Sequence, residues 1–292
     1  MTRRVGVAPL ALLLAAVSSA ALFAADPTVT TSYDVPFTTA GGAELRIDIA
    51  QPAMGDGPFP AILVIHAGAW HEGGREENHR YLLELARRGY VAASPQYRFC
   101  PKDTFPAQLE DVKAAVRFLR SNSKALKVDP EKIGAMGFSA GGHLALLLGV
   151  TGPDDGFDGP AAKGVPSARV QAVVDFFGPA DLNARDFSET ARGFVQCLIG
   201  APAAEKPELA AKASPVTYAG AGDAPVLVFH GSNDTLVPPS QAVELMERLS
   251  AGGVPGRVEF ILGGEHGWQG ADWDRTWKET IEFFDARLKK TR

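Results

Sequence analysis

Cysteine is scarce in this sequence of 292 residues, which contains only Cys100 and Cys197. Two cysteines are too few for a disulfide scaffold, and they lack the C-x-x-C spacing of metal and redox sites. No pair of histidines has zinc-site spacing with supporting carboxylates or cysteines, so the sequence predicts no metal centre. In an oxidising compartment the two cysteines could form one disulfide, and the sequence alone leaves that pairing open.

An excess of positive charge is also absent. The chain has 29 lysines and arginines against 34 aspartates and glutamates, for a formal net charge of −5 at pH 7. This balance argues against electrostatic binding of nucleic acid and leaves small neutral substrates open. No Pro/Gly/Ser-rich linker, internal repeat or low-complexity tract divides the chain. We therefore expect residues 26–292 to form one α/β domain.

No apolar run is long enough to span a bilayer comfortably. The run at the start of the chain extends from Val5 to Val17 and follows the basic pair Arg3 and Arg4. Small residues follow it, and no stop-transfer segment comes after them, so residues 1–25 read as a signal peptide. We expect a secreted or periplasmic protein with no membrane span once the signal is cleaved.

Regularly alternating strands and helices fill the rest of the chain. The segment from Thr30 to Ile49 contains two β-like runs that suggest an antiparallel edge. The continuously apolar run 59–65 then predicts a strand buried on both faces, as in parallel sheets. Further strands are expected at 90–97, 132–138, 170–177, 225–230 and 257–262. Helices are expected at 78–88, 106–126, 140–148, 238–251 and 271–289. This succession predicts a doubly wound, mostly parallel sheet of about eight strands with helices on both faces, and residues 182–218 predict a short helical lid.

The strongest chemical motif is Gly137-Phe138-Ser139-Ala140-Gly141, which fits G-x-S-x-G between an apolar strand and an apolar helix. At such a nucleophile elbow, a strained backbone holds the serine hydroxyl clear of the chain. The flanking glycines avoid collisions that a side chain would cause. An ordinary Gly-Ser turn is the alternative, and the strand–helix context favours the nucleophile.

A serine nucleophile needs a base, and the base needs an acid to orient it. His266 lies in a glycine-rich loop after the last predicted strand, and Asp234 lies in the loop after the strand before it. The order Ser139, Asp234, His266 is the one expected for this type of elbow. A solvated loop histidine and a turn aspartate are the alternatives, and Asp181 after the strand at 170–177 is the rival acid. Among the other histidines, we expect His143 and His230 to be packed, and those at 71 and 79 to be exposed.

The loop His66-Ala67-Gly68-Ala69-Trp70 follows the buried strand that ends at Ile65. Its small residues allow the backbone to approach a substrate closely. We therefore predict an oxyanion hole made by the amides of Gly68, Ala69 and Ala140. A tight strand-to-helix turn would use the same small residues.

These motifs resemble the α/β-hydrolase fold, and within it the hormone-sensitive-lipase-like esterases and the bacterial feruloyl and acetyl-xylan esterase group. The segments that carry the resemblance are 66–70, Tyr97-Arg98, 105–112, 137–145, 178–182, 230–238 and 265–267. The resemblance implies a serine carboxylester hydrolase without metal or organic cofactor. Ala67 departs from the H-G-G-[GA]-W pattern, which puts the geometry of the oxyanion loop in question. Arg98 and Asp111 are expected to be structural, as a pair beneath the site.

The natural ester is the least determined feature. Trp70 and Trp268 flank the oxyanion loop and His266, and either ring could present an apolar face to a sugar or an aromatic acyl group. Core packing is the alternative for both. We expect short acyl esters, with acetyl groups on a polysaccharide first and feruloyl esters second. The alternatives are a prolyl-oligopeptidase-like peptidase, a lipase-like esterase of longer acyl chains and a non-catalytic binding protein of the same fold.

Overall fold

The computed structural model describes residues 28–158 and 164–289, and the predicted signal peptide lies outside these ranges. Eight strands form one sheet in the order β1-β2-β4-β3-β5-β6-β7-β8. The strands are β1 (Val29–Ala40), β2 (Ala43–Pro52), β3 (Phe59–Ile65), β4 (Val91–Pro95), β5 (Val128–Phe138), β6 (Ala172–Phe176), β7 (Val226–Gly231) and β8 (Gly256–Ile261). The strand β1 pairs antiparallel with β2, and β2 pairs antiparallel with β4, whereas the pairs from β4 to β8 are parallel. The predicted antiparallel edge and mostly parallel sheet are confirmed.

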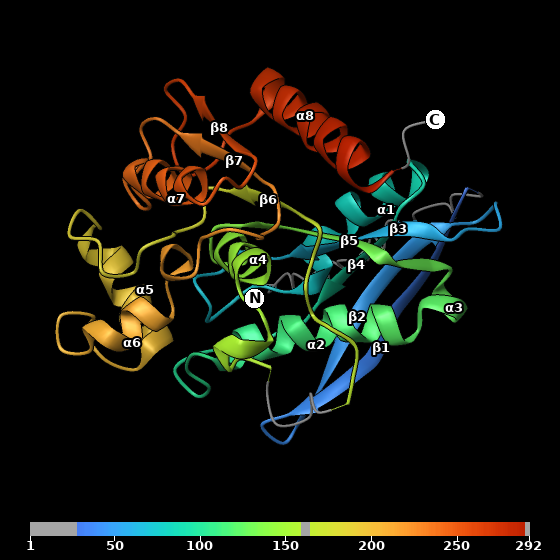
Figure 1. Ribbon diagram of the computed structural model, residues 1–292, viewed down its shortest axis with the longest axis horizontal. Coiled ribbons are helices and arrows are strands. Elements are labelled where there is room, and N and C mark those ends of the chain that lie inside the picture. The colour runs from blue at the N-terminus through green and yellow to red at the C-terminus, as the bar shows by residue number, and fades with distance from the viewer. Residues whose placement is uncertain (1–27, 159–163, 290–292) are drawn as a thin grey trace, which may run out of the picture.

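Helices cover both faces of this sheet (Figure 1). The α-helices are α1 (His79–Arg87), α2 (Ala107–Ser121), α3 (Ser123–Leu126), α4 (Ala140–Val150), α5 (Glu189–Ile199), α6 (Pro207–Lys212), α7 (Ser240–Ala251) and α8 (Gly270–Leu288). Short 3₁₀ turns are η1 (Arg75–Asn78), η2 (Pro153–Asp155) and η4 (Pro215–Thr217). The helix expected over 106–126 is interrupted at Asn122, whose side-chain amide donates to the carbonyl of Phe118.

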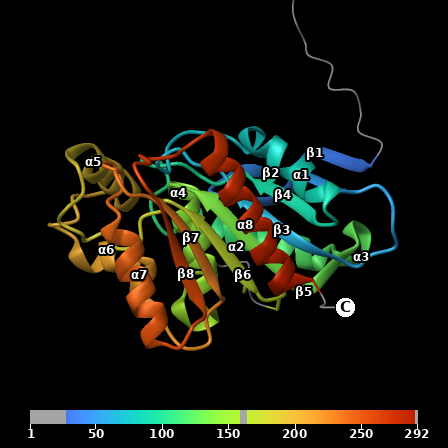
Figure 2. The ribbon, with the colours of Figure 1, turned by 90° about the horizontal axis from the view of Figure 1, so that it is seen from above.

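The two faces of the sheet bury separate apolar clusters. One cluster packs α2, α4 and α7 against the sheet through residues such as Leu109, Leu144 and Leu245. The other packs α1 and α8 against the opposite face, through Leu82 and Phe284 among others. Figure 2 shows α8 running across the strands β5, β6 and β7, which agrees with its contacts. Because both faces are covered, the central strands are mostly apolar, with Ser94 on β4 and Asp175 on β6 among the buried polar exceptions.

The segment predicted as a lid forms short helices. Helices α5 and α6 lie to one side of the sheet in Figure 1, apart from its strands. This segment follows β6, and its end packs back through Val216, whose amide donates to the carbonyl of Ala180. The parallel strands therefore carry their following loops, the elbow and the lid to one end of the sheet, which is where α/β sheets bind ligands.

Candidate active site

Ser139 stands at a sharp turn between β5 and α4. Its backbone has φ 52° and ψ −117°, a conformation that non-glycine residues rarely adopt. Neighbouring glycines make the turn sterically possible. A Cβ atom at Gly137 would lie 2.2 Å from the carbonyl oxygen of Gly141, and one at Gly141 would lie 2.2 Å from that of Ile65. The turn has the geometry of a nucleophile elbow, and the glycines at its two ends are required by contact with backbone atoms.

Ser139, His266 and Asp234 form a continuous chain of hydrogen bonds. The Nε2 atom of His266 lies 2.9 Å from Ser139 Oγ, and its Nδ1 atom lies 2.7 Å from Asp234 Oδ2. A carboxylate can only accept, so Nδ1 carries the proton and Nε2 accepts from the serine hydroxyl. The structure thus brings together three side chains that the sequence places in separate loops.

The carboxylate of Asp234 is buried and fixed by its own loop. Its Oδ1 atom accepts hydrogen bonds of 2.9 Å from the amides of Leu236 and Val237, which leaves Oδ2 for His266. The rival acid Asp181 points elsewhere. It accepts from the amide of Asn183 at the start of the lid segment. Of the two aspartates, only Asp234 contacts the histidine.

The predicted oxyanion loop lies beside Ser139 and lines the same cavity. Gly68 has φ 113°, and a Cβ atom there would lie 2.0 Å from the carbonyl oxygen of Glu72, so this position requires glycine. Within the described chain, the amides of Gly68 and Ala69 donate no hydrogen bond to protein. Ala140 is the first residue of α4, where helical amides have no partner in the preceding turn. Ala67 is accommodated without altering the glycine that the loop needs.

Trp70 ends this loop and is only 3% exposed. Its indole Nε1 donates to Nδ1 of His143 at 3.2 Å, and Nε2 of His143 lies 2.7 Å from the carbonyl oxygen of Ala213, to which it donates. Burial lowers the pKa of His143 to about 4, so the neutral ring joins the oxyanion loop, α4 and the lid segment. Trp70 lines the cavity in front of Ser139, but most of its ring is packed in the interior, which is the core-packing alternative.

The remaining histidines have structural surroundings. His143 and His230 are buried as predicted. The predicted exposure of His71 and His79 is wrong, since both are half-buried. Nε2 of His79 lies 2.7 Å from the buried carboxylate of Asp48, and His71 packs against Phe194. Both contacts come from residues distant in the sequence, Asp48 of β2 and Phe194 of the lid segment, and no local sequence pattern predicts them. Arg98 forms the expected ion pair with Asp111, at 2.8 Å.

A cavity of about 850 Å³ opens in front of Ser139. One group of lining residues, the aromatic wall, comes from α1, the elbow, the loop after β6, the loop after β8 and the start of α8. It contains Tyr81, Phe138, Phe177, Trp268 and Trp273. Other lining residues come from the lid segment, among them Phe187, Ala191, Phe194 and Val195. Trp268 is half-buried in the aromatic wall, where its Nε1 donates to Thr276.

Several residues of this cavity carried no sequence signal. Phe177 packs edge-on against the His266 ring with centroids 4.7 Å apart, and its φ of 48° turns the chain just after β6. Tyr81 and Trp273 are far apart in the sequence, yet their ring centroids lie 5.5 Å apart. Only the packing of α1 beside α8 brings them together. For Phe177, its place at the end of a predicted buried strand does not by itself indicate contact with His266.

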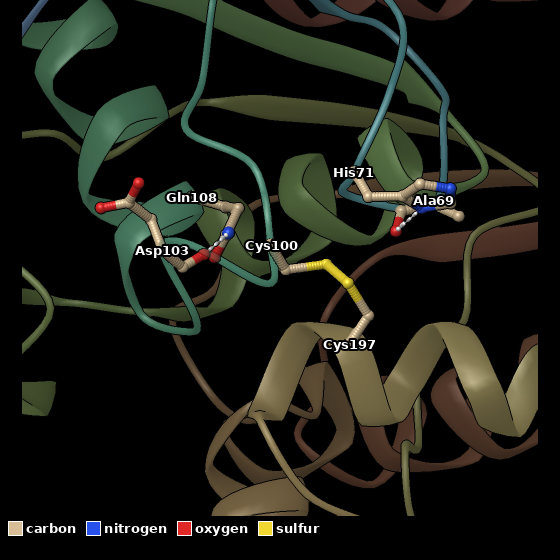
Figure 3. The surroundings of a disulfide bond; sticks show 6 residues. All are labelled: Ala69, His71, Cys100, Asp103, Gln108 and Cys197. Atoms are coloured by element: carbon tan, nitrogen blue, oxygen red, sulfur yellow. Dashed lines mark hydrogen bonds between the residues drawn. A yellow bond between two sulfur atoms is a disulfide. The ribbon is translucent and has the colours of Figure 1, made fainter.

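The structure contains a disulfide between Cys100 and Cys197. Figure 3 shows it joining the loop after β4 to α5, with Ala69 of the oxyanion loop and the following His71 among its surroundings. The amide of Cys100 also donates to the carbonyl of Trp70 at 3.0 Å. The disulfide therefore links α5, which lines the cavity, to the segment that supports the oxyanion loop.

The sheet, the elbow and the loops at its carboxyl end define an α/β-hydrolase fold, as the sequence motifs predicted. The family model described as BD-FAE matches residues 47–249, which is more than half of the chain. The chain therefore belongs to the BD-FAE family.

Similar proteins include the esterase LipC of Mycobacterium tuberculosis. It is 34% identical over 198 residues, which cover 66% of this chain and 49% of LipC. The chain spans about half the length of the curated relatives that it matches first. A solved structure described as a truncated form of a carbohydrate esterase from gut microbiota superposes with a TM-score of 0.79 at 27% identity. It covers 91% of this chain and 99% of its own. A bifunctional GH43-CE of Bacteroides eggerthii has a TM-score of 0.75 at 31% identity, covering 88% of this chain and 38% of its own.

The described residues hold neither a membrane-spanning helix nor a metal-binding cluster. Among residues 28–158 and 164–289, no helix is both long and apolar enough to cross a membrane. The same residues contain no cluster of three or more His, Cys, Asp or Glu side chains suited to a metal ion.

Proposed function

We propose that this protein is a serine carboxylester hydrolase that acts through Ser139, His266 and Asp234. The observation that carries the proposal is the hydrogen-bonded chain of these residues at the nucleophile elbow, with Ser139 Oγ 2.9 Å from the base. Membership of the BD-FAE family and similarity to proteins named as esterases support it. All of these features converge on one cavity.

Hydrolysis would proceed in two halves. Ser139 Oγ attacks the ester carbonyl carbon while His266 Nε2 accepts the hydroxyl proton. The tetrahedral intermediate collapses when His266 returns that proton to the departing alkoxide, which leaves an acyl group on Ser139. Water then attacks the acyl-enzyme by the same route, releasing the acid and restoring the serine. No redox partner or cofactor enters this balance.

Two groups lower the barrier without changing bonds themselves. Asp234 holds the Nδ1–H tautomer of His266 and stabilises the imidazolium that forms. The amides of Gly68, Ala69 and Ala140 would stabilise the negative charge on the carbonyl oxygen, and the first two have no competing acceptor in the described chain. Because the loop is already folded, these donors need no reorganisation during the reaction.

For the substrate, we infer short acyl esters on carbohydrate, with acetyl groups first and feruloyl groups second. The aromatic wall of the cavity suits a sugar ring or an aromatic acyl group. One similar solved structure is named as a carbohydrate esterase. We also propose that the protein is exported, since the basic and apolar start of the chain is typical of a signal peptide and the disulfide suits an oxidising compartment.

The test is a chain-length series of 4-nitrophenyl esters, together with acetate and ferulate release from acetylated and feruloylated xylan. We expect kcat/KM to be highest for short acyl chains, with release of acetate from xylan. Preference for chains of about eight carbons or more, with neither acid released, would favour the lipase-like alternative. Turnover of prolyl-peptide anilides in place of esters would favour the peptidase, and no turnover of any substrate would favour a binding protein.

A further inference from the structure

Arg80 lies at the wall of the cavity in front of Ser139 and has no acidic partner. No carboxylate in the described ranges comes within ion-pair distance of its guanidinium, whereas the neighbouring arginines are paired. Arg75 lies 2.9 Å from Asp48, and Arg88 lies 3.3 Å from Glu84. Arg80 therefore presents an unneutralised positive charge to the cavity.

The guanidinium of Arg80 is held on an aromatic bed. Its Cζ atom lies 4.4 Å from the centroid of the Tyr81 ring and 5.2 Å from that of Trp273. The Nη2 atom of Arg80 also donates a hydrogen bond to the Tyr81 hydroxyl. Stacking and this bond hold the planar group in place and leave most of its five N–H donors unoccupied. A guanidinium held in this way loses little conformational entropy when it binds a planar anion.

The other residues that line the cavity carry little charge. Among the described lining residues, Glu72 is the one carboxylate, and it forms no ion pair with Arg80. Apart from His266, the other lining residues are uncharged, and most are apolar or aromatic. Arg80 itself is exposed, so water reaches the guanidinium, and its attraction for an anion depends on its unpaired charge and its free N–H donors. The chain as a whole carries a net negative charge, so an unpaired cation at the cavity contrasts with the overall charge balance.

We propose that Arg80 binds a carboxylate carried by the ester substrate, on either its acid or its alcohol part. The carboxylate would accept paired hydrogen bonds from the free edge of the guanidinium, while the body of the substrate lies against the aromatic wall. The preferred substrate class is therefore an ester with a second, ionised carboxyl group. This inference rests on the proposed hydrolase function and adds the chemical class of its substrate.

Kinetics with matched ester pairs test the proposal. The acid side is probed with 4-nitrophenyl hemisuccinate against neutral 4-nitrophenyl butyrate. The alcohol side is probed with O-acetylglycolate against its methyl ester. We expect Arg80→Gln to lower kcat/KM for the anionic ester of at least one pair by about tenfold, and to change the neutral esters less than twofold. Arg80→Lys should retain only part of the preference, because an ammonium cannot bind a carboxylate in the two-point manner.

Arg88→Gln is the matched control, since Arg88 caps the same helix but lies outside the cavity. It should change neither ester. Equal losses on anionic and neutral esters in Arg80→Gln, or no loss on either, would overturn the proposal. Equal losses would leave Arg80 as a cover for Tyr81 and Trp273.

A binding measurement separates this inference from the hydrolase function. In Ser139→Ala protein, monomethyl succinate is titrated while tryptophan fluorescence is followed, because Trp273 lies under the guanidinium. Saturable quenching that disappears with Arg80→Gln supports the anion site even if no ester is hydrolysed. Quenching that is the same with and without Arg80, or is absent in both, contradicts the anion site and leaves ester hydrolysis to stand on its own test.

Discussion

At Ser139 the backbone lies in a region that costs of order 1–3 kcal/mol for a residue with a side chain. The surrounding contacts maintain it. The amide of Ser139 donates to the carbonyl of Phe176 at 2.8 Å, and its carbonyl accepts from His143 at 3.0 Å. The strain aims the hydroxyl at His266. Preorganisation is therefore located in the backbone of a single residue, supported by the strand beside it and the helix after it.

The glycines of the elbow give the first residue-scale prediction. We expect Gly141→Ala to destabilise the protein by about 2 kcal/mol or more and to reduce turnover, because the new methyl group would collide with the backbone carbonyl of Ile65. Gly193→Ala is the control. Gly193 lies in α5 with open space around it, so alanine should stabilise the protein by about 0.5–1 kcal/mol. Urea denaturation measures both, and equal stability of the two variants would contradict the steric account.

The acid of the site gives the second residue-scale prediction. Asp234→Asn should lower kcat by about 10³- to 10⁴-fold, since an amide cannot hold the imidazole in the same tautomer and oriented charge is lost. Asp181→Asn should retain nearly full activity, because Asp181 contacts the lid segment and not His266. Steady-state hydrolysis of 4-nitrophenyl acetate ranks the two. The reverse ranking would assign the acid role to Asp181.

At the scale of elements, periodicity and motif order predicted most of the architecture. The buried strands and the helices on both sides follow from local apolar patterns, and the antiparallel edge follows from alternation at 43–49. What could not be predicted depends on contacts between distant elements. The side chains of Tyr81 and Trp273 meet because α1 and α8 share one face of the sheet. The prediction that His79 is exposed is wrong for the same reason, because its partner Asp48 lies on β2, far from α1 in the sequence.

The disulfide gives a prediction at this scale. It links α5 to the loop after β4 across 97 residues of sequence. Replacing both cysteines with serine should lower the free energy of unfolding by about 2–4 kcal/mol, because the unfolded chain regains the freedom that the loop had lost. Thermal denaturation with and without reductant is the measurement. Reductant should lower the melting temperature of the wild type and leave that of the double variant unchanged. Equal changes in the two proteins would contradict a structural disulfide.

At the scale of the whole molecule, buried ionisable groups change the stability of the fold in opposite directions as the pH changes. Burial lowers the pKa of His66 and of His143 to about 4, so both favour folding above about pH 6.5 and lose that contribution as the pH falls towards 4. Burial raises the pKa of Asp175 to about 8. The folded protein then retains a proton that the unfolded chain releases near pH 4, so this contribution to stability is lost as the pH rises towards 8. The two trends favour maximum stability between these limits.

Asp175→Asn isolates one of these contributions. The asparagine Oδ1 can still accept from the amide of Gly178, which lies 2.9 Å from Asp175 Oδ1, but the side chain no longer ionises. We expect the stability difference between variant and wild type to grow in favour of the variant from about pH 4 to pH 8, by on the order of a few kcal/mol. Urea denaturation across that range provides the profile. A difference independent of pH would show that the carboxyl group is not held protonated.

Ser139, at the cavity lined by segments from α1 to α8, is the proposed nucleophile that attacks the ester. The most direct measurement compares hydrolysis of 4-nitrophenyl acetate by wild type and by Ser139→Ala, with circular dichroism confirming that the variant is folded. We predict a fall in kcat of roughly 10⁴-fold or more, because the oxyanion hole and binding alone provide only residual catalysis. Turnover by folded Ser139→Ala close to that of the wild type would contradict the account.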